Sequence, residues 1–82
     1  MDFKAALSRG MPVVGGDGED VGKVKRVEDD TFLVERRFER DVFVPFDGIK
    51  EISSDRVVLT VSHKDVGKMG WKNPPLAFPG RT

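Results

Sequence analysis

Short apolar runs, each broken by turn-forming residues, constrain the fold of this chain more than any other feature. None of the runs approaches the roughly 20 residues that a membrane-spanning helix needs. Several runs alternate apolar and polar residues, which is the period of a strand with one buried face. Strands are expected over Met11–Val14, Val21–Val27, Thr31–Arg36, Val42–Phe46 and Val57–Val61, with a further short segment anchored by Ile49 and Ile52. About six short strands in one small chain predict an all-β fold, a small β-barrel.

Two of these strands indicate how they sit in the sheet. In Thr31–Arg36, Phe32 and Val34 share one face, while Leu33 lies on the other. Apolar residues on both faces are expected of a strand in a closed or doubly covered sheet. Pro45 has no amide hydrogen for a ladder, so it should mark the end of its strand or an edge position.

A glycine-rich stretch raises the alternative of a phosphate-binding loop. Gly16, Gly18 and Gly22 have a spacing one residue too long for a dinucleotide-binding loop, and no Gly-Lys-Ser/Thr follows as a P-loop requires. Such loops also open a helix that receives the phosphate. Glycine and aspartate tolerate positive φ, so Gly16-Asp17-Gly18 instead predicts a tight turn between two strands.

The valines after this turn predict a strand with an irregularity. Val21, Val24 and Val27 have the spacing of a helical face, but Gly22 and the β-branched side chains favour a strand. A period of two cannot place all three valines on one face. The spacing therefore predicts a β-bulge.

Both ends of the chain carry weaker signals. Residues 2–9 are compatible with a short helical turn or an extended segment. Residues 62–69 predict a helical turn, with Ser62 as N-cap and Asp65 at the third helical position. Residues 70–82 are rich in proline and aromatic residues and predict an extended tail. The chain is thus expected to form a barrel domain over 1–69 and a tail over 70–82.

Composition excludes several classes of function. The 82 residues include no cysteine, which rules out disulfides, thiolate metal sites and a cysteine nucleophile and fits a cytoplasmic location. The 14 basic and 14 acidic residues cancel, which removes a global electrostatic argument for binding nucleic acid or an anionic membrane. The first residues include an early aspartate and no continuous apolar stretch, so neither a signal peptide nor membrane insertion is expected.

The order of these features resembles the PRC-barrel superfamily. That superfamily is named for the cytoplasmic domain of the photosynthetic reaction-centre H subunit, and a related barrel forms part of a bacterial ribosome-maturation factor. The segments that carry the resemblance are Met11–Val14, Asp17–Val24, Phe43–Phe46 with Ile49 and Ile52, and Arg56–Val57-Val58-Leu59.

This resemblance covers roughly residues 9–66 and looks most like the short stand-alone bacterial members, many of unknown function. It implies a β-barrel with a binding or assembly role. It implies no catalytic residue, because the superfamily has no shared chemistry. The chain shows neither the membrane helix of the reaction-centre subunit nor the extra domain of the ribosome factor.

The residue types of an enzyme are present without their arrangement. Ser62, His63 and Asp65 include the types of a hydrolase triad, but sequence neighbours do not converge in that geometry. His63 is expected at the surface, at the start of a helix. One histidine and no cysteine argue against a transition-metal site, and the acidic turn 17–20 lacks the EF-hand pattern. No catalytic, cofactor-binding or metal-binding residue is predicted.

Basic residues supply the alternative function, association with RNA or the ribosome. Phe38 lies among them and offers a ring on which a base can stack. Glu35, Glu39 and Asp41 interleave with them, and such alternation is typical of a solvated, cross-strand-paired surface. The candidate nucleic-acid contacts are Lys23, Lys25, Arg26, Arg36, Arg37 and Arg40.

Large apolar residues supply the preferred function, a non-catalytic module for protein interaction and assembly. Trp71 either folds back to plug one end of the barrel or docks with the tail on a partner, because exposed aromatic residues mark interfaces. The predicted partner is a second copy of the chain or an unidentified protein. The candidate interface residues are Trp71, Leu76, Phe78, Phe38 and Phe43.

Overall fold

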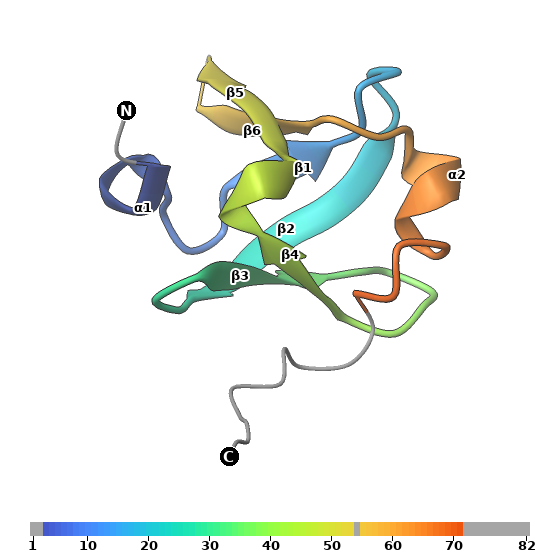
Figure 1. Cartoon of the computed structure of the whole chain (residues 1–82), viewed down its shortest axis with the longest axis horizontal. Coiled ribbons are helices and arrows are strands. Elements are labelled where there is room, and N and C mark those ends of the chain that lie inside the picture. Colours follow the sequence, from blue (N-terminus) through green and yellow to red (C-terminus); the bar gives the residue numbers. More distant parts are fainter. Residues whose placement is uncertain (1–2, 54, 72–82) are drawn as a thin grey trace.

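The structure is a computed structural model that describes residues 3–53 and 55–71. The elements are α1 (Phe3–Ala6), β1 (Pro12–Val14), β2 (Asp20–Val27), β3 (Thr31–Glu35), β4 (Val42–Pro45), the 3-10 helix η1 (Phe46–Gly48), β5 (Ile49–Ser53), β6 (Arg56–Leu59) and α2 (His63–Val66). A six-stranded sheet curls into a half-barrel, in the order β4-β3-β2-β1-β6-β5 (Figure 1). Neighbouring strands are antiparallel except for the parallel pair β1 and β6. The predicted all-β fold is confirmed.

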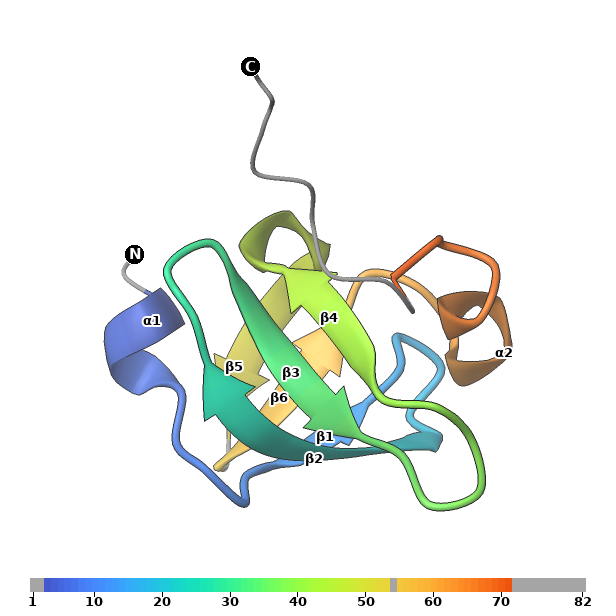
Figure 2. The ribbon, with the colours of Figure 1, turned by 90° about the horizontal axis from the view of Figure 1, so that it is seen from below.

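The two edges of the sheet are β4 and β5, and η1 connects them (Figure 2). Pro45 ends β4 at one of these edges, where its missing amide hydrogen costs no ladder bond. The prediction for Pro45 is therefore confirmed. Beyond Pro45, the amide of Phe46 still donates to the carbonyl of Asp30 at 3.3 Å, which extends the link between β3 and β4 by one residue pair.

The predicted bulge is present in β2, and it occurs twice. Val21 has no opposing residue in the ladder with β1, and Lys25 has none in the ladder with β3. Each extra residue resets the alternation, because residues two apart otherwise share a face. As a result Val21 and Val24 are buried in the core, and Val27 packs against it.

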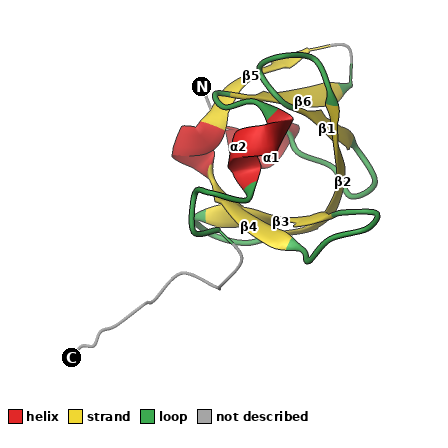
Figure 3. Cartoon of the chain, turned by 90° about the vertical axis from the view of Figure 1, so that its right-hand side faces the viewer, coloured by secondary structure: helices red, strands yellow, loops and turns green. Residues whose placement is uncertain are grey.

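The core fills the hollow of the curled sheet. The two short helices lie at its opposite open ends, α1 at the left and α2 at the right of Figure 1, and in Figure 3 both appear inside the outline of the curled strands. Leu7, just after α1, and Val66, in α2, belong to the same buried cluster as the strand residues. Phe32 is fully buried and stacks on Phe46 with ring centres 6.3 Å apart. The helices thus close a sheet whose strands alone would leave apolar ends exposed to water.

The glycine-rich stretch forms the predicted tight turn between β1 and β2. The amide of Gly18 donates to the carbonyl of Gly15 at 2.9 Å, and Gly18 has a φ of 84°. A strand follows the turn, so it lacks the helix N-terminus of a phosphate loop. The amide of Gly16 donates to the carbonyl of Val61 at 2.8 Å, which ties the turn to the segment that follows β6.

Element ends differ slightly from the prediction. The third strand stops at Glu35 rather than Arg36, and the last stops at Leu59 rather than Val61. Ser62 precedes α2 as predicted, but its side chain makes no capping hydrogen bond. Its backbone carbonyl instead accepts the amide hydrogen of Asp65 at 3.0 Å, so the backbone alone closes the first turn.

Candidate functional site

Two adjoining pockets open beside the loop 36–41, which joins β3 to β4. Both contain Asp20 and Arg37. The strand pocket, of about 410 Å³, is lined by Asp20, Gly22, Lys23, Glu35 and Arg37. The loop pocket, of about 230 Å³, is lined by Asp20, Val21, Arg36, Arg37, Phe38, Glu39 and His63. Together they bring the start of β2, the end of β3 and the start of α2 to one candidate site.

Phe38 is the apolar feature of this site. Its residue surface is 89% exposed, although its phenyl ring is large and apolar. The guanidinium carbon of Arg37 lies 5.6 Å from the ring centre, in range of a cation–π contact. A large aromatic side chain held at the tip of a charged loop is the type of group that protein interfaces bury.

Arg36 is the buried charge of the site. Its side chain is only 8% exposed, and its Nη2 lies 2.8 Å from Oε2 of Glu39. Its Nη1 is buried and has no hydrogen-bond partner among the described residues. The sequence indicated a solvated surface here. The structure instead buries most of the Arg36 side chain, which no local pattern signals.

Asp17 and His63 form a pair across the site that sequence reasoning missed. Asp17 Oδ2 lies 3.2 Å from His63 Nδ1, and the carboxylate also accepts the backbone amide hydrogens of Glu19 at 3.2 Å and His63 at 3.4 Å. Partial desolvation raises the pKa of Asp17, but these hydrogen bonds together outweigh it and leave the pKa below 3.8. A Cβ on Gly15 would lie 2.5 Å from the backbone nitrogen of His63, so only glycine at position 15 permits the close approach of these two segments.

His63 begins α2 as predicted, and its carboxylate partner is Asp17 rather than the neighbouring Asp65. The two residues are 46 positions apart in the chain. The sequence gives no signal of this pairing except the glycine at position 15, and the need for that glycine becomes visible only in the structure. The hydrolase-triad reading of Ser62, His63 and Asp65 has no support in this geometry.

We expect Asp17→Asn to reduce the acid sensitivity of the fold. A carboxyl whose pKa is lowered by folding stabilises the native state above its unfolded pKa, and this contribution disappears as pH falls through the folded pKa. The melting temperature of the wild type should therefore fall more steeply than that of Asp17→Asn as the pH drops below about 4, the ordinary pKa of an aspartate, measured by circular dichroism. Asp47→Asn, at an exposed carboxylate on η1, is the matched control. Parallel curves for wild type and Asp17→Asn would contradict this role.

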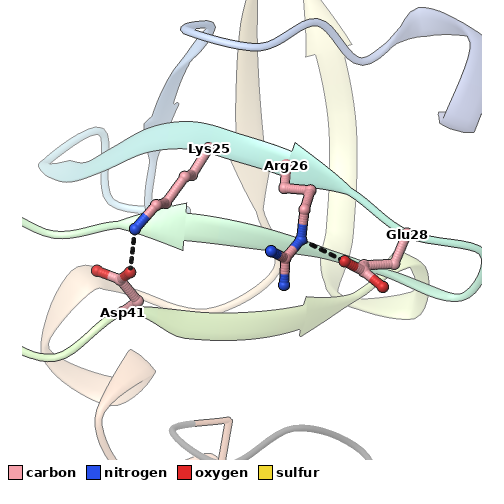
Figure 4. A network of polar contacts seen from close by, with 4 residues as sticks. All are labelled: Lys25, Arg26, Glu28 and Asp41. Atoms are coloured by element: carbon pink, nitrogen blue, oxygen red, sulfur yellow. Dashed lines mark hydrogen bonds and ion pairs between the residues drawn. The ribbon is translucent and has the colours of Figure 1, made fainter.

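Two of the basic residues predicted to contact nucleic acid form ion pairs with carboxylates on the outer surface of the sheet. Lys25 reaches across β3 to Asp41, with 3.2 Å between Nζ and Oδ2 (Figure 4). Arg26 pairs with Glu28 on the same surface. The long apolar stem of Lys25 thereby lies over the sheet while its charge stays near water. Both cations are therefore paired with carboxylates of their own chain.

The remaining basic residues do not form one unmixed face. Lys23 and Arg37 line the strand pocket, and Arg36 is buried beside Glu39. Arg40 is exposed on the same loop and lines neither pocket. Carboxylates stand among them in both pockets, as the alternating sequence indicated.

The predicted interface residues occupy different positions. Trp71 packs against the core, and its carbonyl accepts the amide hydrogen of Phe43 at 2.6 Å. Phe43 itself is half-buried on β4. Leu76 and Phe78 lie outside the described residues. Among the candidates that the structure describes, Phe38 alone is exposed.

Residues 3–53 and 55–71 contain neither a candidate metal site nor a membrane-spanning helix. No three histidine, cysteine, aspartate or glutamate side chains gather there in a metal-binding arrangement. No helix in these ranges combines the length and apolarity needed to cross a bilayer.

Comparison with known proteins finds one family. A sequence model of a family described as "Uncharacterized protein conserved in bacteria (DUF2171)" matches residues 7–67. No curated protein and no solved structure matches the chain. The matched span contains all six strands, both pockets and α2.

Proposed function

The chain belongs to the bacterial DUF2171 family, and we propose that it is a non-catalytic interaction module that binds a protein, in the first place a second copy of itself. The observation that carries this proposal is the 89% exposure of Phe38 on the loop 36–41. Among the described residues the other large apolar side chains pack inward except Met69, which is far less exposed than Phe38. Within the same residues, the Phe38 ring has no partner except the guanidinium of Arg37.

Burial of Phe38 supplies the driving force for association. Full burial of a phenylalanine side chain contributes about 1.5–3 kcal/mol relative to exposure. Arg37 and the neighbouring carboxylates then form a polar rim that stays near water, the arrangement of a typical interface. The mechanism needs no catalytic group, and the Asp17–His63 pair acts in it only as a clasp between the β1–β2 turn and α2.

The PRC-barrel resemblance supports this proposal, because it implies a β-barrel with a binding or assembly role. Its segments correspond to β1, the β1–β2 turn with the first half of β2, β4, β5 and β6, all of which belong to the curled sheet or its turns. We propose membership of that superfamily, which the order of these segments supports. The proposed location is the cytoplasm, which the absence of cysteine favours.

The test is the solution mass of the full chain and of Phe38→Ala by light scattering at low and high salt. We expect the wild type to be a dimer or larger and Phe38→Ala to be monomeric. The variant should keep the circular dichroism spectrum of the folded chain, because Phe38 is exposed within its own chain. Its melting temperature should equal that of the wild type only at concentrations where the wild type is dissociated, since association itself stabilises the folded state. Arg40→Ala, on the same loop, is the control and should keep the wild-type mass.

Two results would count against self-association through Phe38. One is a monomeric wild type across the concentration range, and the other is an unchanged mass for Phe38→Ala.

The second candidate function, RNA binding, has one observation in its favour: the contact of Arg37 with Phe38, close to Lys23 and Arg40. If Arg37, Lys23 and Arg40 each contacted one phosphate of a single strand, the affinity for RNA would fall as the salt concentration rises. The slope of log affinity against log salt concentration would be about −2.

A further inference from the structure

The loop pocket contains a group that burial of Phe38 does not use, the guanidinium of Arg36. We propose that the loop pocket receives a carboxylate from the partner protein, held by Arg36, beside an apolar residue that packs on Phe38. The inference rests on the proposed function, since it names the chemistry of the segment that the module binds.

The unpartnered Nη1 of Arg36 is the main observation. Buried polar atoms in folded proteins almost always have a hydrogen-bond partner, and a buried charged donor without one is costly. The side chain is 8% exposed, and Glu39 engages only Nη2. A guanidinium fork can hold two acceptors at once, so Arg36 has the capacity for a second carboxylate oxygen. Nη1 itself is covered, so the incoming carboxylate reaches it once a neighbouring side chain moves aside.

The other charges around the pocket favour a single carboxylate over a polyanion. Asp20 and Glu39 line the pocket and balance the two arginines, Arg36 and Arg37. A phosphate backbone would bring several negative charges toward these two carboxylates and be repelled. One carboxylate that enters beside Arg36 gains charge-assisted hydrogen bonds and adds one negative charge.

The apolar part of the partner follows from the position of Phe38, which lines the same pocket. A residue adjacent to the carboxylate can cover the exposed ring while the carboxylate reaches Arg36. The partner segment is therefore an acidic residue next to an aromatic or large aliphatic one. This combination gives both direction and burial to an interface that Phe38 alone would leave unspecific.

His63 provides a local readout, because it lines the pocket and is the single histidine of the chain. The probe is N-acetyl-aspartyl-phenylalanine amide, titrated into the isotope-labelled full chain at constant neutral pH. We expect a saturable shift of the His63 imidazole signals by NMR. The matched peptide with asparagine in place of aspartate should give none, since it lacks the charge.

Variants on the same loop test the role of Arg36. Arg36→Met should weaken peptide binding at least about tenfold, equivalent to 1.4 kcal/mol. Arg40→Met removes an arginine that lines neither pocket, and it should bind as the wild type does. Arg36→Lys keeps the charge without the planar fork, and it serves as the folded comparison if Arg36→Met does not fold.

Three outcomes would overturn the carboxylate site. They are no saturable shift of His63 with the aspartyl peptide, equal binding of the asparaginyl peptide, and wild-type affinity in a folded Arg36 variant. Inorganic phosphate that saturates the same signals while the peptide does not would also overturn it. Failure here leaves the light-scattering result for Phe38→Ala untouched, so the two proposals are separable.

Discussion

Gly22→Ala is expected to destabilise the fold by at least about 3 kcal/mol and to lower the melting temperature by about 12 °C or more. Gly22 lies in β2, where the chain passes very close to β3. A Cβ added there would overlap the carbonyl oxygen of Glu35 and stand 3.0 Å from Cγ1 of Val34. Backbone and a fully buried valine cannot move aside, so the two strands would have to separate.

Gly67→Ala is the matched control for this prediction. Gly67 follows α2 with right-handed helical angles (φ −68°, ψ −16°), and an added Cβ there meets nothing within 4 Å. Alanine at such a position restricts the unfolded chain and should be neutral or stabilising by up to about 1 kcal/mol. Thermal melts followed by circular dichroism give both values. Equal melting temperatures for the two variants would show that β2 and β3 tolerate wider spacing.

Trp71→Ala is expected to cost about 3 kcal/mol of folding stability, at the lower end of the range for core tryptophans because Trp71 is only partly buried. The indole packs against the core, and its Cη2 stands 3.1 Å from where a Cβ on Gly48 would lie. Alanine keeps the backbone hydrogen bond to Phe43, so the loss measures the packing of the ring. Denaturant unfolding in urea gives the free energy directly.

Met69→Ala is the comparison, because Met69 lies two residues earlier and is 43% exposed. Its substitution should change stability by about 0.5 kcal/mol or less. A Trp71→Ala variant as stable as Met69→Ala would contradict a structural role for the indole. A Trp71→Ala variant that is stable but no longer self-associates would instead show that Trp71 acts in the interface between copies.

The candidate site could be predicted from the sequence only in part. Phe38, Lys23 and Arg37 were candidates because aromatic and basic residues on a charged hairpin mark a surface that can bind. The sequence could not separate these from Lys25 and Arg26, whose charges are paired on the outer face of the sheet. It also could not separate Phe38 from Trp71, since exposure depends on what packs nearby and not on residue type.

The strands, the tight turn at residues 15–18, the bulges of β2 and the terminal position of Pro45 were all determined by the sequence itself. These features follow from the alternation of side chains, from glycine's freedom at positive φ and from proline's missing donor, all of which act within a few residues. The burial of Arg36 and the Asp17–His63 pair were decided only by the tertiary structure. The curl of the sheet brings the β1–β2 turn against α2, and tertiary packing buries the guanidinium of Arg36. Contacts between residues 46 positions apart depend on that closure, which no local pattern encodes.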